Sequence, residues 1–487
     1  MIWRADPFIG GGFLSGFEPR LFINDPVTGR TMAETSTASV EQVDQAVQGA
    51  YRLLPKLRQE PVGRRAARLH RIAAVLQQGA SELSALLAQE TGKPQEAAAR
   101  EVAGSAALFE FYGTEATRLM GKFAPALRTN EHVVVSWEPI GVVGAIAPFN
   151  YPLTLMSLKI APALAAGCPV VAKPAPETSL TLLKVVELCH AAGIEADLVN
   201  VVTGSAEVGQ ALVGHPLIAK VSFTGSVAAG RAVAAAAGRD LKRLTLELGG
   251  QSAALIAADA DLDTCVPVLV AQAFDNAGQF CYRPARFFVE EDGYDVFLAK
   301  FRDHAMSLVV GAPTEPGVNL GPLRLASGYD KVVRHVEDAL ARGARLVCGG
   351  QRLRGPRYDG GYFYPPTVLA NASPDMIVMQ EETFGPVVAV ARVKRLEDAV
   401  AQANRIPLGL AGYVYCRDLG RGWRIADALE AGSVWVNAMH HTNRHVPFGG
   451  RKASGLGREK GVEGLMEYVE SKTVYLGLTH EHPPESE

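Results

Sequence analysis

The chain has little of what marks a nucleic-acid-binding, secreted or membrane protein. Its 487 residues carry 48 Lys and Arg against 51 Asp and Glu, a formal net charge of −3 without any block of like charge. Such a balance gives a nucleic acid nothing to bind. The apolar stretches are broken by Gly, Pro and Lys, and the N-terminus lacks the apolar core of a signal peptide. We therefore expect a soluble cytoplasmic protein with neither a nucleic-acid nor a membrane partner.

Cysteine is also scarce. Six are present, none of them in a C-x-x-C pair or in a Cys/His cluster with zinc spacing. We therefore expect no metal site, and in a reducing compartment we expect free thiols instead of disulfides. Five of the six cysteines are interpreted as small buried apolar side chains.

The order of the predicted elements indicates two α/β domains. Residues 39–130 have helical periodicity, and the alternating, β-branched segment 132–140 is typical of an edge or protruding strand. From residue 141 short apolar strands alternate with helices as far as residue 248, and a second alternation begins near residue 253. Such alternation predicts doubly wound parallel sheets, which bind ligands beyond the carboxyl ends of their strands.

The sixth cysteine, Cys281, has the setting of a nucleophile. It ends the glycine-bearing segment Asn276-Ala-Gly-Gln-Phe-Cys281, which follows an apolar run. Glu247 lies at the end of a strand-like run, just before a glycine pair. A thiol in such a turn and a carboxylate at a strand end suit a nucleophile and a base acting on a carbonyl group. A salt-bridged strand-end carboxylate is the alternative for Glu247 taken alone.

Two strand ends suggest a bound dinucleotide. The segment 223–230, Phe-Thr-Gly-Ser-Val-Ala-Ala-Gly, follows a strand and opens a helix, so Gly225 allows close backbone approach and the helix N-terminus suits a phosphate. Lys173 ends a neighbouring strand, where it can donate to ribose or phosphate oxygens. Taken singly these are a tight turn and a solvated lysine, and the G-x-G-x-x-G fingerprint is absent. Together they predict a dinucleotide.

With these residues the chain resembles the NAD(P)-dependent aldehyde dehydrogenase superfamily, from about residue 20 to about residue 475. The motifs that carry the resemblance are Pro148-Phe-Asn150-Tyr-Pro152, Lys173-Pro174, Phe223-Thr-Gly-Ser226, Leu246-Glu247-Leu-Gly-Gly250, Gly278-Gln-Phe-Cys281, Glu381-Glu382-Thr-Phe384-Gly-Pro386 and Pro447-Phe448-Gly-Gly450. One of them could arise by chance, but all of them in this order could hardly do so.

The resemblance implies a domain organisation. It divides the chain into an NAD(P)-binding domain of residues 1–121 and 140–247, a catalytic domain of residues 248–446, and a segment of residues 447–465 that returns to the cofactor domain. Residues 122–139 and 466–487 would form a small oligomerisation element. Apolar and polar residues alternate in both segments, which fits strands that pair across subunits and so cover an exposed strand edge. A homodimer or a homotetramer is expected.

The resemblance also implies a mechanism. Cys281 attacks the aldehyde carbon as a thiolate, the hemithioacetal gives up a hydride to the nicotinamide, and water releases the acid from the thioester. The side-chain amide of Asn150 and the Cys281 backbone N–H would hold the oxyanion. Glu247 would deprotonate the water, and Lys159 would lie near Glu247 and help to relay its proton. For Asn150 alone, a turn asparagine before Tyr151-Pro152 is the alternative.

Cofactor contacts follow from the same resemblance. The implied set is Ala147, Pro148, Phe149, Lys173, Pro176, Gly209, Phe223, Gly225, Ser226, Gly230, Leu248, Glu382 and Phe384. Glu382 and Phe384 would contact the nicotinamide ribose, unless they are a strand-start acid and a core aromatic. Many NAD-preferring members carry a glutamate at the position of Pro176, and without that acid a 2′-phosphate meets no repulsion. NAD is the expected cofactor, with NADP also admitted.

The substrate tunnel is implied by position only. Its lining would be Tyr112, Tyr151, Leu155, Leu158, Phe280, Tyr282 and the loop 438–445. Leu158 stands where several members carry tryptophan, which argues against an aromatic box for a quaternary ammonium. The basic residues His440, His441, Arg444 and His445, with Arg283, favour a polar or anionic aldehyde such as a semialdehyde, unless they face solvent or another subunit. An aliphatic aldehyde also stays open, and no metal is expected at the three histidines.

Two other functions stay open at this point. A CoA-acylating relative would transfer the acyl group to CoA, which would make Glu247 redundant as a deacylating base. A non-enzymatic binding protein on the same fold would have no need of Cys281, Glu247 and Asn150 together. The presence of these residues therefore favours hydrolytic release of the acid.

Overall fold

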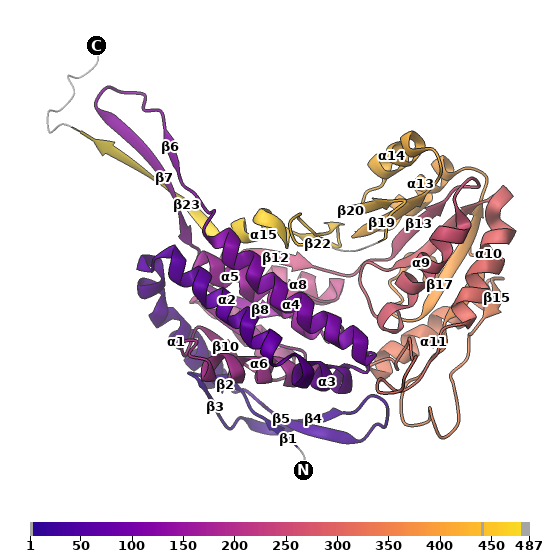
Figure 1. The fold of residues 1–487 in the computed structure, drawn as a ribbon, viewed down its shortest axis with the longest axis horizontal. Coiled ribbons are helices and arrows are strands. Elements are labelled where there is room, and N and C mark those ends of the chain that lie inside the picture. The colour runs from indigo at the N-terminus through magenta and orange to yellow at the C-terminus, as the bar shows by residue number, and fades with distance from the viewer. Residues whose placement is uncertain (1–2, 440–442, 479–487) are drawn as a thin grey trace.

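The structure, a computed structural model, describes residues 3–439 and 443–478 and contains two large sheets side by side (Figure 1). The first sheet has the strand order β22-β12-β11-β8-β9-β10-β2-β3, and its five central strands run parallel. These are β8 (Val142–Ile146), β9 (Val170–Lys173), β10 (Val199–Val201), β11 (Ile218–Thr224) and β12 (Arg243–Glu247). Because the strands are parallel, Lys173 and Glu247 lie at the same edge of the sheet.

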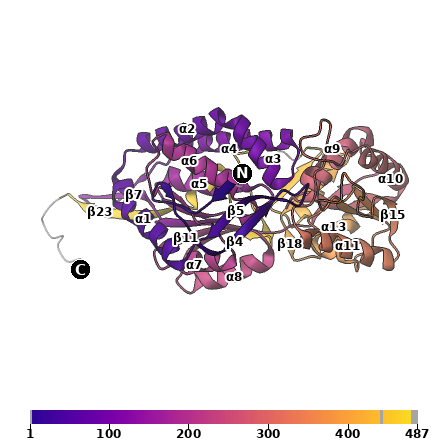
Figure 2. The same ribbon diagram turned by 90° about the horizontal axis from the view of Figure 1, so that it is seen from below.

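Helices cover both faces of this sheet (Figure 2). One face carries α1 (Val40–Gln59), α7 (Ala206–Gly214) and α8 (Val227–Gly238), and the other carries α2 (Val62–Gln78), α3 (Ala80–Thr91), α4 (Gln95–Ala116), α5 (Pro152–Ala166) and α6 (Leu180–Ala191). A separate buried apolar cluster fills each interface. Helix α5 is buried along almost its whole length, because it is apolar on every side and other helices cover it. The expected doubly wound arrangement is confirmed.

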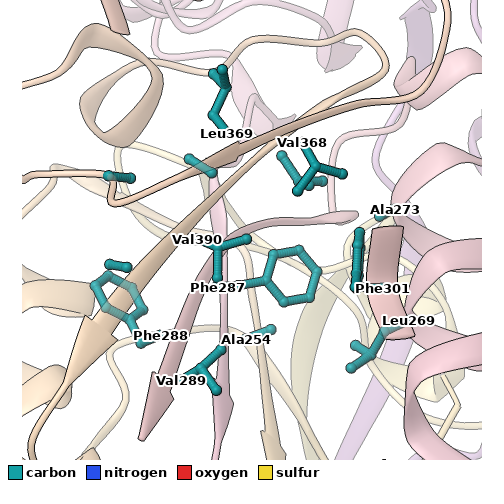
Figure 3. Packing of buried hydrophobic residues seen from close by; sticks show 14 of the residues in the cluster. Ala254, Leu269, Ala273, Phe287, Phe288, Val289, Phe301, Val368, Leu369 and Val390 are labelled. Atoms are coloured by element: carbon teal, nitrogen blue, oxygen red, sulfur yellow. The ribbon is translucent and has the colours of Figure 1, made fainter. Parts of the chain in front are cut away.

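The second sheet has the order β15-β16-β17-β14-β13-β19-β20. Its strands are β13 (Ser252–Ile256), β14 (Pro284–Glu290), β15 (Arg345–Cys348), β16 (Thr367–Ala370), β17 (Val387–Val393), β19 (Ala411–Tyr415) and β20 (Ser433–Val436), and its helices are α9 (Leu262–Phe274), α10 (Glu291–Met306), α11 (Ala326–Ala341), α12 (Ile377–Gln380), α13 (Leu396–Asn404) and α14 (Leu419–Ala428). Phe287 of β14 points toward Ala273 and Phe301, the residues of α9 and α10 that cover it (Figure 3), with its ring centroid 5.0 Å from that of Phe301.

An antiparallel arm projects from the body of the molecule (Figure 1). It consists of β6 (Lys122–Ala124), β7 (Glu131–Pro139) and β23 (Val469–Gly477), with β7 in the middle. After Val469 every residue of β23 is exposed in the single chain. Phe123, Tyr475 and Leu476 are among the large apolar side chains left in solvent.

Parts of the fold differ from the sequence-based expectation. The helical prediction is wrong beyond residue 116, where α4 ends, because Gly121 and Pro125 interrupt the pattern before β6. The sheets are not wholly parallel, since β2 (Phe8–Ile9), β3 (Gly12–Phe13), β15 and β22 (Gly455–Leu456) pair antiparallel at the edges. Further strands are β1 (Trp3–Ala5), β4 (Phe17–Asn24), β5 (Thr31–Thr37), β18 (Leu408–Gly409) and β21 (Arg451–Lys452). Within residues 3–439 and 443–478 no helix is both long and apolar enough to span a membrane.

Candidate active site

A strained turn presents Cys281. Asn276, Ala277 and Gly278 follow one another with φ values of 50°, 55° and 70°, in the left-handed region. Gly278 is required there, because a Cβ atom at this position would lie 2.2 Å from the carbonyl oxygen of Gly385. Left-handed non-glycine residues cost conformational energy, and they cluster at functional sites. The turn leaves Cys281 partly exposed. Cys348 is also partly exposed, so only four of the five cysteines expected to be buried are so: Cys168, Cys189, Cys265 and Cys416.

Asn150 is tied to this turn from the first sheet. Its Nδ2 atom donates to the Gln279 carbonyl at 3.0 Å, and its own carbonyl accepts from Asn276 Nδ2 at 2.9 Å. Asn150 is buried, and its Oδ1 atom has no hydrogen-bond partner among the described residues. The structure therefore brings the amide of residue 150 and the backbone of Gln279 together, although they are 129 positions apart in the chain.

Glu247 lies at the end of β12 and is 4% exposed. Within the described residues its Oε1 atom has no hydrogen-bond partner. Burial and the nearby Glu459 carboxylate raise the pKa of Glu247 well above its usual range, and Lys159 opposes this shift. Burial, with the charges of Glu247 and Glu382, likewise raises the pKa of the Cys281 thiol. A buried carboxyl with a raised pKa can take a proton near neutral pH, as a general base must.

Lys159 makes its hydrogen bonds with a residue that sequence reasoning missed. Its Nζ atom donates to Glu459 Oε1 at 2.7 Å and to Thr224 Oγ1 at 2.7 Å. Lys159 therefore acts on Glu247 through its charge, and the buried Glu459 is a second carboxylate whose charge also acts on Glu247. The sequence signal was the run Gly457-Arg-Glu-Lys-Gly461 after the Pro447-Phe448 motif, which places three consecutive charged residues between two glycines.

Lys460, the next residue, was also missed. It is 7% exposed, and its ammonium lies 5.0 Å from the centroid of the Phe448 ring. Burial lowers the pKa of Lys460 to about 8, while Glu459, Glu247 and Cys281 act in the opposite direction. Its positive charge in turn opposes the rise in the pKa of Cys281. Lys460 therefore places a cation beside the candidate nucleophile.

The predicted dinucleotide contacts form a cradle along the first sheet. Lys173 is buried at the end of β9, where burial lowers its pKa to about 8, and its Nζ atom bonds only to the Pro174 carbonyl, at 3.3 Å, among the described groups. Gly209 packs over its stem, since a Cβ there would lie 3.5 Å from Lys173 Cδ. A buried ammonium with hydrogen-bonding capacity to spare can bind the ribose or phosphate oxygens of a ligand.

The N-terminus of α8 completes the cradle. Ser226 caps the helix by accepting from Ala229 N at 3.2 Å. A side chain at Gly225 would meet the Phe223 ring at 2.5 Å, and one at Gly230 would meet Leu248 at 2.4 Å. Because both positions lack a side chain, a diphosphate can approach the free N–H groups of the helix. The residues present therefore fit NAD or NADP.

Two of the remaining predicted cofactor residues, Glu382 and Phe384, come from the segment before β17. Glu382 Oε1 accepts from Gly250 N at 3.1 Å. Phe384 has a φ of 52°, and its ring meets the ring of Phe149 edge-on at 6.0 Å. Three further positions are Ala147 at the end of β8, the half-buried Pro148, and Pro176, which begins the short 3₁₀ helix Pro176–Thr178.

The predicted substrate residues divide into two groups. Phe280, Tyr282 and Tyr151 form an aromatic cluster around the thiol segment, with Phe280 4.0 Å from Tyr282 and 5.7 Å from Tyr151 between ring centroids. The Tyr151 hydroxyl donates to Asp275 Oδ2 at 2.7 Å. In the other group, Tyr112 is fully buried next to Phe111, Leu158 of α5 belongs to an apolar cluster, and Leu155 is half-buried against that cluster.

The basic residues do not behave as one group. Arg283 is buried, and it donates to the carbonyls of Ala273 and Val387, so the expectation that it serves the substrate is wrong: it ties β14 to its neighbours. Arg444 is exposed and donates to the Ala107 carbonyl, and the His445 ring packs on Phe111. His440 and His441 lie outside the described residues. Among the described residues no cluster of three or more His, Cys, Asp or Glu side chains could hold a metal ion.

Fold and residue set together define a dinucleotide-dependent oxidoreductase. A model of the aldehyde dehydrogenase family matches residues 16–474, and the chain belongs to this family. A mitochondrial succinate-semialdehyde dehydrogenase of Arabidopsis thaliana is 38% identical over 481 residues, 98% of this chain and 90% of the relative. A glutarate-semialdehyde dehydrogenase of Pseudomonas aeruginosa is 37% identical over 478 residues, 98% of each chain. A solved structure of an Escherichia coli NADP-dependent enzyme superposes with a TM-score of 0.95 at 37% identity, over 98% of each chain. The protein is thus an oxidoreductase that acts on aldehydes with NAD or NADP.

Proposed function

We propose that Cys281, Asn150 and Glu247 carry out the oxidation of an aldehyde to its acid through a thioester on Cys281. The observation that supports this most is the link between Asn150 and the Cys281 turn, through the bond from Asn150 Nδ2 to the Gln279 carbonyl. It holds an amide donor next to the nucleophile, where the oxyanion forms.

Each residue then has one task. The Cys281 sulfur bonds to the aldehyde carbon, and the oxyanion accepts from Asn150 Nδ2 and the Cys281 backbone N–H. A bound NAD(P)⁺, held by Lys173 and the N-terminus of α8, would supply the hydride acceptor for that carbon. Glu247 removes a proton from the water that attacks the thioester, and the C–S bond breaks to release the acid and the thiol. Lys159 and Glu459 lie behind Glu247 and set the charge around its carboxyl.

We propose an aldehyde with a second, acidic group as substrate. The named relatives act on succinic and glutaric semialdehydes, and Lys460 offers a buried ammonium beside Phe448, whose ring lies 5.1 Å from that of Tyr282. A carboxylate that reaches this ammonium exchanges water for an ion pair in a site of low polarity. We therefore assign binding of the substrate's acidic group to Lys460, and not to Arg283, which had been suggested by its position in the sequence.

For the cofactor, we propose that the site accepts both NAD and NADP. Pro176 offers no carboxylate to repel a 2′-phosphate, and Lys173 supplies a cation at the same sheet edge. The test is reduced-cofactor absorbance at 340 nm with succinic semialdehyde, glutaric semialdehyde, butanal, pentanal and an aromatic aldehyde, each with NAD and with NADP. Rates with and without CoA also separate hydrolytic from CoA-acylating release. Turnover that requires CoA, or none with any aldehyde, would contradict the proposal.

Lys460→Met tests the substrate class. We expect kcat/KM for succinic semialdehyde to fall about tenfold more than kcat/KM for butanal, which has the same number of carbons and no acid; a tenfold ratio corresponds to about 1.4 kcal/mol. Using the ratio removes any effect of Lys460 on the thiol, since that effect is common to both aldehydes. Lys452→Met is the control, because Lys452 bonds to the carbonyls of Asn404 and Ile406 on the surface. An unchanged ratio in Lys460→Met would contradict the assignment of the anion to Lys460.

We also propose that the arm pairs with a second copy of the chain in a homodimer or homotetramer. Exposed apolar side chains on β23, such as Tyr475 and Leu476, fit an interface of this kind. We expect light scattering to give two or four times the chain mass of 51.8 kDa, and the double variant Tyr475→Asp, Leu476→Asp to give smaller species. A monomeric wild-type protein at micromolar concentration would contradict this.

A further inference from the structure

A buried ion pair lies behind the Asn150 segment and takes no part in the chemistry described so far. Lys93, in the loop between α3 and α4, and Glu101, on α4, form a salt bridge between side chains that are 0% and 1% exposed. Taking two charges out of water is costly, and an apolar pair of similar volume is often as stable or more so. Stability alone therefore does not account for a fully buried lysine and glutamate here.

Both partners use their remaining hydrogen-bonding capacity on one short stretch of backbone. Lys93 Nζ donates to the Asn150 carbonyl at 2.8 Å. Glu101 Oε1 accepts from Leu153 N at 3.0 Å and from Thr154 N at 3.1 Å, in the first turn of α5. Tyr151, at the N-cap of α5, provides no side-chain cap, so Glu101 caps this helix from another element.

The same stretch is held from the opposite side by the nucleophile turn. Asn276 Nδ2 donates to the carbonyl of Asn150 that Lys93 also binds, and Asn150 Nδ2 reaches the Gln279 carbonyl. The Lys93 ammonium also lies 3.9 Å from the centroid of the Tyr151 ring, a cation–π contact. Residue 150 is thus fixed between a charged pair on one side and the Cys281 turn on the other.

We propose that Lys93 and Glu101 are positioning residues for the Asn150 amide. They touch neither aldehyde nor cofactor, and they act by holding the backbone of residues 150–154 at a fixed distance from the Cys281 turn. An oxyanion donor works only within a narrow range of positions, and removal of one donor typically costs a factor on the order of 10² to 10³ in rate. A small displacement of the Asn150 amide is expected to cost a part of that factor.

The inference rests on the oxyanion role proposed for Asn150, and its test separates the two. Lys93→Met keeps the stem and removes the ammonium, and Glu101→Gln keeps the shape and removes the charge. The readout is the pre-steady-state burst of reduced cofactor, which reports formation of the thioester, together with cofactor affinity and Tm. We expect the burst rate constant to fall about tenfold or more in both variants, with cofactor Kd unchanged within twofold.

A double-mutant cycle distinguishes positioning from a general loss of stability. In an Asn150→Ala background, where the positioned amide is absent, Lys93→Met should slow the burst by less than about twofold. Lys220→Met is the matched control: Lys220 is equally buried, pairs with Glu467 and lies over the Tyr468 ring, but it contacts none of these residues. It should lower Tm and leave the burst rate constant unchanged.

Each other outcome overturns a defined statement. If Lys93→Met slows the burst by the same factor with and without the Asn150 amide, or does not slow it at all while Asn150→Ala does, the positioning role is wrong and the oxyanion role stands. If Asn150→Ala itself bursts at the wild-type rate, the oxyanion role is wrong and the inference falls with it.

Discussion

Replacing Cys281 by alanine is expected to abolish aldehyde oxidation while cofactor binding persists. The substitution removes the only atom proposed to bond to the aldehyde carbon, and loss of a nucleophile from a covalent mechanism costs on the order of 10⁴-fold or more in kcat. The fold should tolerate it, because Cys281 is partly exposed and lies beyond the packed core of the second sheet. Reduced-cofactor absorbance at 340 nm measures the activity, and titration with NAD and NADP measures binding.

Cys416→Ala is the matched control for this prediction. Cys416 is a buried thiol of the same sheet and belongs to its apolar cluster, so its loss should lower Tm slightly and leave kcat within about twofold. Iodoacetamide supplies an independent check, since it should inactivate the wild-type enzyme and the Cys416→Ala variant alike. Substantial turnover by Cys281→Ala would contradict the covalent mechanism.

The sequence could predict those features of the site that a few consecutive residues determine. The segment from Asn276 to Cys281 carries its own turn, since Gly278 permits the left-handed backbone next to Gly385. Glu247 follows a run of strand residues, so its place at a carboxyl edge follows from the parallel order of the sheet. The fold class was predicted from the alternation of strands and helices, and the family from its resemblance over seven motifs; the family match and the solved structure confirm both.

What the sequence could not predict depends on contacts between distant residues. Glu459 meets Lys159 across 300 residues, and Lys93 meets Asn150 across 57. No local pattern distinguishes such partners from surface charges. Arg283 is close to Cys281 in the chain, but this does not determine where its side chain points. Its guanidinium donates to the backbone carbonyls of Ala273 and Val387 and not toward the thiol. The N-terminal strands β1 to β5 also escaped prediction, although they pair mainly with one another and only β2 pairs with the distant β10.

Glu247→Gln is expected to separate the two halves of the reaction. Formation of the thioester does not need this carboxylate as the base for water, so reduced cofactor should still appear in a burst that approaches one per active site. Hydrolysis should then slow by a factor on the order of 10² to 10⁴, the usual contribution of a general base. Rapid-mixing absorbance at 340 nm measures the burst, and mass spectrometry of the quenched protein should find the acyl group on Cys281.

The dependence of kcat on pH should also report the ionisation of Glu247. Burial and Glu459 raise the pKa of Glu247 well above its usual range, and only the ionised form accepts a proton from water. Wild-type kcat should therefore fall as the pH drops through this raised pKa, and Glu247→Gln should lose that limb. Lys159→Met removes the cation that opposes the shift, so it should move the limb to higher pH. If Glu247→Gln turns over at the wild-type rate, water activation by Glu247 is not the step that completes the reaction.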